Sequence, residues 1–293
     1  MSLQACAESL RAHDPDRFGI CLLVPQAARP KLLTLYALNL ELARAPLASN
    51  EPLIAEMRLQ WWIERLEAIG SGDLSAHELL VPLAEAWGAR AVDFAVLAEA
   101  RRRDAAREAH DGPAAVAAYV RDTAVPLALF AAEALDGPKA ATLACAAQAE
   151  AGGGLEDVGA GGFAPPDPRG IFVHRRSREP VAHVIAAQAE GAGLAAWLAA
   201  LPVLQGLGLG LWDPSASALA EIAAHARGKL AEARAQRHHI PRRLAPVLFS
   251  GVGARAALEA APRGIEALAG AQPSEFRKRL ALTRFAVSHR WWI

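Results

Sequence analysis

Histidine, cysteine and nucleophile motifs would identify hydrolytic or metal chemistry, so their spacing is the first observation. The nine histidines form no HExxH pair, and His238 and His239 are adjacent, so on a helix they would point about 100° apart and would not share a metal. Cys6, Cys21 and Cys145 lie far apart, which argues against a cysteine zinc site or a disulfide framework and fits a reducing cytoplasm. No GxSxG, Walker or strand-flanked GxGxxG motif occurs. We therefore expect no metal centre of these kinds and no classical hydrolase.

Three basic clusters stand out, at residues 101–103, 174–178 and 276–280, and each is typical of a solvated face. The last cluster belongs to a predicted C-terminal helix that is rich in arginine and is followed by Trp291 and Trp292. Cations beside tryptophans are typical of a lipid interface, which would make the protein a peripheral membrane protein. The alternative, which we prefer, is that the cations complement the helix dipole and the tryptophans pack on the body.

Helices are the elements that must position any site. Apolar residues at three- and four-residue spacing predict a helix from about Pro30 to Ala43, ended by the Arg-Ala-Pro segment at residues 44–46. A second helix follows, with Asn50 as the expected cap, and stops at residues 70–72. Further helices are predicted over residues 77–87, 91–108, 113–135 and 138–150, then near Pro180, over 215–237, near Pro241 and from Ser274. A Gly/Pro-rich segment at about 151–172 cannot be one regular helix.

Composition agrees with this pattern and limits the function classes. The net charge is +0 and the chain lacks the basic excess of nucleic-acid-binding proteins, so we expect no nucleic-acid partner. Aromatic residues are only 6% of the chain while alanine and leucine are abundant, which favours an all-α fold in a single domain, residues 1–293. No signal peptide is evident, and Pro202 and five glycines interrupt the apolar stretch 191–212, which favours a buried helix pair or loop over a membrane span.

Two segments resemble the squalene/phytoene synthase family. DPDRFGICLLVPQAARPKLLTLYALNLELARAP is similar to the family's opening, in which an Asp-Arg-Phe segment and a Pro-x-x-x-Arg turn precede a helix beginning Leu-Tyr-Ala-Phe. EPLIAEMRLQWWIERLEAI resembles the next helix. Its Arg-Leu-Gln-Trp-Trp core is especially similar to a divergent branch of α-proteobacterial relatives and the mitochondrial complex I assembly factor with a squalene/phytoene synthase domain.

The resemblance implies an isoprenoid-synthase-like bundle of helices around a central cavity. Active members join two prenyl diphosphates head to head, and Mg²⁺ neutralises the leaving diphosphate. Because Mg²⁺ prefers oxygen ligands, two facing helices each supply an Asp-rich motif in such members.

The chain departs from this pattern in both motifs. Counted from Tyr36, the expected arginine is Leu40 and the expected acids are Ala43, Arg44 and Leu47. The fixed charge of Arg44 would repel Mg²⁺, and Glu41, the only nearby acid, should point to another face.

The second motif corresponds to GGLEDVGAG, residues 153–161. Asp157 is kept, Glu156 replaces an arginine, and Gly153 replaces the expected asparagine. Glycines in this stretch should also weaken the helix that would present it.

Three hypotheses follow. In the first, the protein has lost prenyl transferase activity and is a binding protein or a respiratory complex I assembly factor, without a cofactor, in the cytoplasm or at the inner face of the inner membrane. Its partners would be an apolar or prenyl diphosphate ligand, or complex I subunits. In the second, it is an active Mg²⁺-dependent prenyltransferase that uses Asp157, Glu156 and Glu41. In the third, it is a helical scaffold with an occluded cavity. The candidate cavity or ligand-binding residues are Tyr36, Leu40, Ala43, Arg44, Arg58, Trp61, Gly153 and Asp157.

Intrahelical pairing offers a simpler role for Arg58, with Glu51 or Glu64. Tyr36 and Trp61 could equally be core residues.

Overall fold

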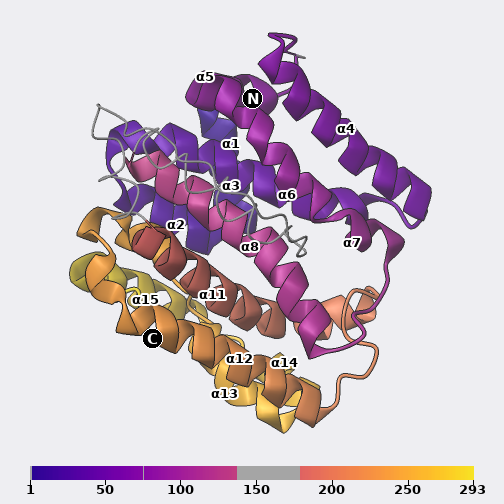
Figure 1. Ribbon diagram of the computed structural model, residues 1–293, viewed down its shortest axis with the longest axis vertical. Coiled ribbons are helices and arrows are strands. Elements are labelled where there is room, and N and C mark those ends of the chain that lie inside the picture. The colour runs from indigo at the N-terminus through magenta and orange to yellow at the C-terminus, as the bar shows by residue number, and fades with distance from the viewer. Residues whose placement is uncertain (1, 75, 137–178) are drawn as a thin grey trace, which may run out of the picture.

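The computed structural model describes residues 2–74, 76–136 and 179–293, and within these ranges the only extended pairing is one isolated bridge between His110 and Leu211. The fold is all-α, as predicted. Figure 1 shows the N-terminal helices in the upper part of the molecule and the C-terminal helices in the lower part, with α8 (Pro113–Asp136) and α11 (Glu179–Gly206) between them. The predicted single domain over residues 1–293 stays a prediction.

The N-terminal helices have apolar faces that pack into the core, and the second of them has a capping residue at its start. After α1 (Leu3–His13), Asp14 caps α2 (Pro15–Leu23) by accepting a hydrogen bond from the backbone N–H of Arg17, and Pro15 starts the helix. A short 3₁₀ turn, η1 (Gln26–Ala28), leads into α3 (Arg29–Arg44). Leu32, Leu35 and Leu38 of α3 are fully buried, so α3 is a core helix whose ends alone reach the surface.

The next helix, α4 (Pro52–Gly70), follows the 3₁₀ turn η2 (Ala45–Ala48). The expected cap at Asn50 is wrong. Glu51 is the N-cap residue, its side chain makes no capping bond, and its own backbone N–H is bound by the Ser49 hydroxyl.

The predicted helix over residues 91–108 is also wrong, because the segment is divided into η3 (Gly88–Phe94), α6 (Ala95–Glu99) and α7 (Arg102–Ala106), which follow α5 (Leu80–Trp87). Tertiary contacts decide its path. Gly88 enters it with a positive φ of 58°, and the ring of Phe94 packs edge-on against Trp87 and Phe130. Arg107 ends it in the left-handed region, with φ 54°. These anchors override the helix propensity of the sequence.

α8 and α11 are the two long apolar helices, and each contains an internal proline, Pro126 and Pro202. Both are long and apolar enough to cross a membrane, although 44% and 67% of their most apolar windows are buried inside the molecule. Buried core helices of soluble proteins share this length and apolar composition. The predicted helix 138–150 and the Gly/Pro-rich segment lie outside the described residues.

α11 crosses its neighbours at two glycines. A Cβ added to Gly193 would lie 2.6 Å from the side chain of Val120 on α8. A Cβ added to Gly191 would lie 2.9 Å from the carbonyl oxygen of Ala226 on α12 (Ala216–Ala235). Glycine is therefore required at both crossings, and α11 is held tightly between α8 and α12.

The remaining elements surround α11 and α12. The 3₁₀ turns η5 (Arg237–His239) and η6 (Arg242–Leu248) precede α13 (Ala254–Ala260), η7 (Ala261–Arg263) and α14 (Ile265–Gly270). The last helix is α15 (Glu275–Ser288), whose N-cap Ser274 accepts a hydrogen bond from the backbone N–H of Arg277.

Candidate functional site

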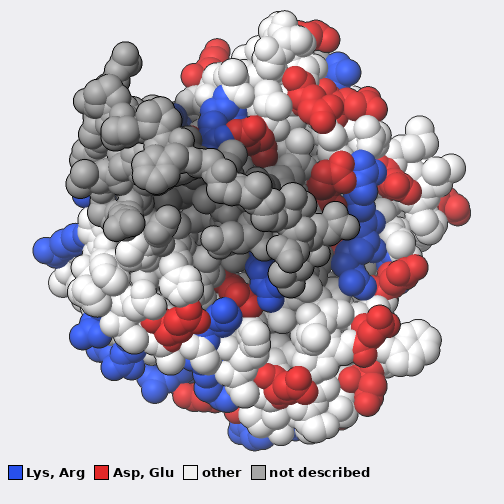
Figure 2. All heavy atoms as spheres, in the orientation of Figure 1, with Lys and Arg blue, Asp and Glu red and all other residues white. Residues whose placement is uncertain are grey.

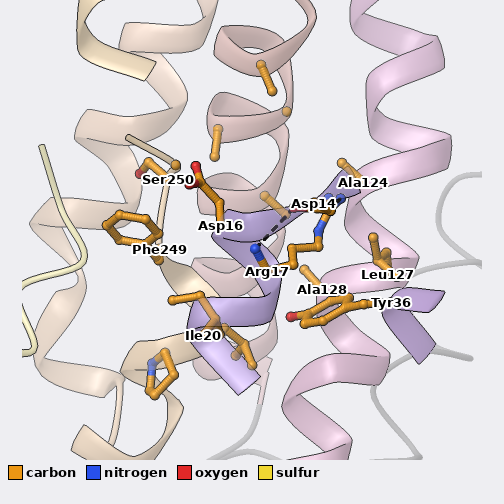
Figure 3. Close-up of a pocket in the computed structure, with 17 residues that line it drawn as sticks. Asp14, Asp16, Arg17, Ile20, Tyr36, Ala124, Leu127, Ala128, Phe249 and Ser250 are labelled. Atoms are coloured by element: carbon orange, nitrogen blue, oxygen red, sulfur yellow. Dashed lines mark hydrogen bonds and ion pairs between the residues drawn. The ribbon is translucent and has the colours of Figure 1, made fainter. Parts of the chain in front are cut away.

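A central cavity of about 250 Å³ lies between α2, α3, α8, α11 and residues 246–251 (Figure 3). Small residues form much of its wall on α8 and α11, including Ala124, Ala128, Ala192, Gly193 and Ala196. Its polar side chains are Asp14, Asp16, Arg17, Tyr36 and Ser250. The cavity is thus mostly apolar with a few polar groups, which is the usual character of a small-molecule site.

Arg17 is the cationic group of the cavity. Its guanidinium Nη1 donates to a carboxylate oxygen of Asp14 at 2.7 Å, and its Cζ lies 5.5 Å from the centre of the Tyr36 ring. Burial works against the charged form of Arg17, but the carboxylate of Asp14 and the neighbouring Tyr36 outweigh it and raise the Arg17 pKa. Burial also raises the pKa of Tyr36, so its phenol is neutral at physiological pH. Arg17 is therefore a permanent cation that is already paired with Asp14.

Asp16 lies at the opposite end of the cavity from this pair, near Ser250 (Figure 3). Its carboxylate accepts the backbone N–H of Val252 at 3.3 Å. Burial is the main reason that the pKa of Asp16 is raised. With two carboxylates and one guanidinium, the cavity does not have the positive charge that a bare diphosphate would need.

The predicted site residues are distributed over two places. Tyr36 lines the central cavity. Glu41, Arg44, Arg58 and Trp61 instead line a separate hollow of about 340 Å³, which we call the hollow beside α4; its other lining residues are Ala45, Ala48, Trp62 and His77.

The remaining predicted residues line neither place or lie outside the described part. Leu40 packs against the apolar core and Ala43 is half-buried. Gly153, Glu156 and Asp157 lie outside the described residues.

The hollow beside α4 combines two guanidinium groups with aromatic rings. Arg44 approaches Glu41 at 3.8 Å, and both side chains are partly exposed. Trp61 and Trp62 each lie within 5.3 Å of the His77 ring, measured between ring centres, and burial lowers the pKa of His77. In the described part of the chain, Arg58 forms no ion pair with Glu51 or Glu64, and Glu64 instead accepts a hydrogen bond from Gln60. Cationic and aromatic groups here could hold a phosphate-bearing ligand.

Asp14, Asp16 and Arg17 are the cavity residues that sequence reasoning missed. The signal was present, because the segment Asp-Pro-Asp-Arg-Phe carries the family resemblance and places three charges at a helix start. Nothing in the sequence showed that this helix start faces Tyr36 across a cavity.

The described residues do not fit a magnesium-diphosphate cluster. Leu40, Ala43, Arg44 and Leu47 offer no oxygen ligand, and Glu41 lies in the hollow beside α4 rather than in the cavity. No group of three or more His, Cys, Asp or Glu side chains in the described ranges is arranged to hold a metal ion. The second Asp-rich segment lies outside these ranges.

Comparison with protein-family models identifies a domain in the chain. Residues 10–154, just under half of the chain, match the family model for squalene/phytoene synthase, a family with an all-α isoprenoid synthase fold. No curated protein matches the chain. The match covers α2 to α8, which supply Asp16, Arg17, Tyr36 and one wall of the central cavity.

Proposed function

We propose that this chain, which carries a squalene/phytoene synthase-like domain, has lost prenyl transferase activity and acts as a binding protein or assembly factor. By the resemblance of its Arg-Leu-Gln-Trp-Trp segment, its role would be in forming respiratory complex I, with an apolar or prenyl ligand bound near the inner membrane. The protein would be a pseudoenzyme with a ligand cavity.

The observation that carries the proposal is the chemistry of α3 and the turn that follows it. Tyr36 of α3 lines the central cavity, but the positions that hold carboxylates in active relatives carry Ala43 and Arg44 at the end of α3 and Leu47 in η2. Ionisation of an allylic diphosphate needs its growing negative charge neutralised, which is the largest contribution that such a site makes to catalysis. A helix that offers a guanidinium in place of this carboxylate cluster cannot anchor Mg²⁺ for that purpose.

The cavity itself supports a binding role. Its walls are apolar, and its guanidinium is already paired, so the best ligand is an apolar chain with a small polar head that hydrogen bonds to Tyr36 or Ser250.

The alternative is an active head-to-head prenyl diphosphate synthase that uses Mg²⁺ with Asp157, Glu156 and Glu41. This function would require Glu41 to turn away from Arg44 and toward the cavity. A scaffold without any ligand is the third hypothesis, and the presence of the cavity argues against it.

An assembly factor needs a surface for a protein partner, and α4 offers one. Leu53, Ile54, Met57 and Trp61 are exposed and follow one face of α4 at helical spacing. Arg44 and Arg58 border this face at the adjoining hollow. We propose that a helix of a complex I subunit or assembly intermediate, carrying apolar residues and an acid for these arginines, docks here.

The hollow beside α4 also gives a ligand-binding prediction. Arg44→Ala should weaken the binding of farnesyl diphosphate, measured by tryptophan fluorescence without Mg²⁺, by roughly tenfold, because a charge-assisted hydrogen bond to phosphate is lost. Arg255→Ala, an exposed arginine on α13, is the matched control and should leave the affinity unchanged. An unaltered affinity in the Arg44 variant would discard this role for Arg44.

Deletion of the gene tests the assembly role. The amount of assembled complex I on native gels should fall, and a plasmid copy of the wild-type gene should restore it. A copy carrying Leu53→Ser and Met57→Ser should restore complex I poorly, because the apolar docking face is lost. The control is a copy carrying Trp212→Ser, which changes an exposed apolar residue elsewhere and should restore complex I fully. Unchanged complex I in the deletion strain would remove the assembly role.

A further inference from the structure

Positive charge is concentrated in two segments of a chain whose net charge is zero. Residues 233–250 contain four arginines and no acid, and residues 271–293 contain five Lys or Arg residues and one acid, Glu275. Glu275 is itself bound by Lys278 at 2.8 Å. We call these two segments the basic end of the molecule.

The two segments meet in space. The ring of Trp292 lies 5.7 Å from the guanidinium carbons of both Arg237 and Arg290, and Phe249 packs on Phe285 with ring centres 4.8 Å apart. Figure 2 shows Lys and Arg side chains gathered along the lower left edge, over the part of the molecule that Figure 1 shows to contain α15 and the end of α12. The two segments therefore meet around Trp292, while Arg243 of the first segment is paired with Asp136 at the end of α8.

α15 has one packed face and one exposed apolar face. Leu282 packs over Gly19 of α2, and Phe285 is buried. On the other side, Phe276 is 74% exposed, Leu280 55% and Val287 77%. Their spacing of four and seven residues aligns them along the helix.

Cations lie on both sides of this exposed face. Arg277 and Arg284 lie on one side of it and Arg279 on the other, by helical geometry, and all three are exposed. A helix with an apolar stripe between cations can lie in the plane of a lipid interface, with the stripe inserted and the cations at the headgroups.

We infer that the basic end is a docking surface for a bilayer that contains anionic lipid, with α15 lying in the interface. Charge complementarity selects an anionic surface, and each nearby cation strengthens the attraction. The exposed Phe276, Leu280 and Val287 favour lipid over nucleic acid, because insertion would remove their apolar surface from water and the two aliphatic side chains cannot stack on bases. The inference needs neither a prenyl ligand nor complex I.

The docking surface adjoins an opening of the central cavity. A surface groove lined by Val203, Pro273 and Lys278 shares Asp16, Ser250 and Gly251 with the cavity. Docking through α15 would bring this groove to the membrane surface, so that an apolar ligand could pass between bilayer and cavity without crossing water. This last step rests on the proposed binding function, whereas the docking itself does not.

Sedimentation with vesicles tests the docking. The whole protein should bind vesicles of phosphatidylcholine and phosphatidylglycerol, bind phosphatidylcholine vesicles weakly, and lose binding as salt is added. The variant Arg277→Gln/Arg279→Gln/Arg284→Gln should bind anionic vesicles about tenfold or more weakly, because three headgroup contacts are lost. Phe276→Ser/Leu280→Ser keeps every charge and should also bind less well, at low salt as well as high.

The matched control is Arg255→Gln/Trp212→Ser, which removes one exposed cation and one exposed aromatic ring from other parts of the surface and should bind like the wild type. Failure of the wild type to bind anionic vesicles would overturn the inference, as would full binding by the charge variant. Equal binding to single-stranded DNA, unaffected by Phe276→Ser/Leu280→Ser, would show a general polyanion surface and would also overturn it. These readouts are independent of complex I levels and of pyrophosphate release.

Discussion

Purified protein supplied with Mg²⁺ and farnesyl or geranylgeranyl diphosphate should release pyrophosphate no faster than buffer alone. We expect essentially no enzymatic pyrophosphate release, because α3 lacks the carboxylates that would hold Mg²⁺ against the leaving group and carries Arg44 at one of those positions. The two adjacent acids kept in the second motif, Glu156 and Asp157, cannot replace two Asp-rich clusters. A coupled phosphate assay over a range of Mg²⁺ concentrations measures the rate.

A family member with both Asp-rich motifs serves as the positive control for this assay. The informative variant is Asp157→Ala, which should change nothing if the protein is a pseudoenzyme. Measurable pyrophosphate release by the wild type that disappears in Asp157→Ala would establish the prenyltransferase alternative.

Replacing Arg90 by methionine should destabilise the protein by about 3–5 kcal/mol. Arg90 of η3 donates three hydrogen bonds of 3.0–3.2 Å to Glu133 of α8, and the side chain of Glu133 is only 4% exposed. Arg90 also contacts Asp93 and lies over the ring of Phe130. Methionine keeps much of the volume but leaves a buried carboxylate without its cation, which is the costly outcome.

The free energy of unfolding in urea, measured for Arg90→Met and for Arg90→Met/Glu133→Leu, separates the effect of the unpaired buried charge from the effect of lost packing. The double variant should regain most of the lost stability, because no buried charge is left unpaired. Arg255→Gln breaks the exposed Arg255–Glu259 pair and should cost less than about 1 kcal/mol. If Arg90→Met were as mild as Arg255→Gln, the buried pair would not contribute to holding η3 on α8.

Sequence reasoning was most successful where periodicity and end signals agreed. The boundaries of α3 and α4 lie within one or two residues of those expected, because proline and glycine mark their ends. It failed over residues 91–108, where the Trp87, Phe94 and Phe130 rings decide the path of the chain. Such contacts join residues far apart in the sequence and leave no periodic signal.

The candidate site was predicted in part for the same reason. Tyr36 could be placed by its motif, but its partners Asp14 and Arg17 lie on another helix and meet it only in the folded chain. Conversely, Glu41 and Arg44 lie five and eight positions after Tyr36 on α3, turn to a different face and line a separate hollow, which Trp61 of α4 also lines.

The glycine crossings at Gly191 and Gly193 limit what the cavity can accept. Since α11 has no room to move sideways against α8 or α12, a guest molecule cannot push these walls apart. Space can be gained only lengthwise, along the groove toward Val203. If the ligand is the prenyl chain proposed above, the protein should tolerate a change in its number of isoprene units better than added width across the chain.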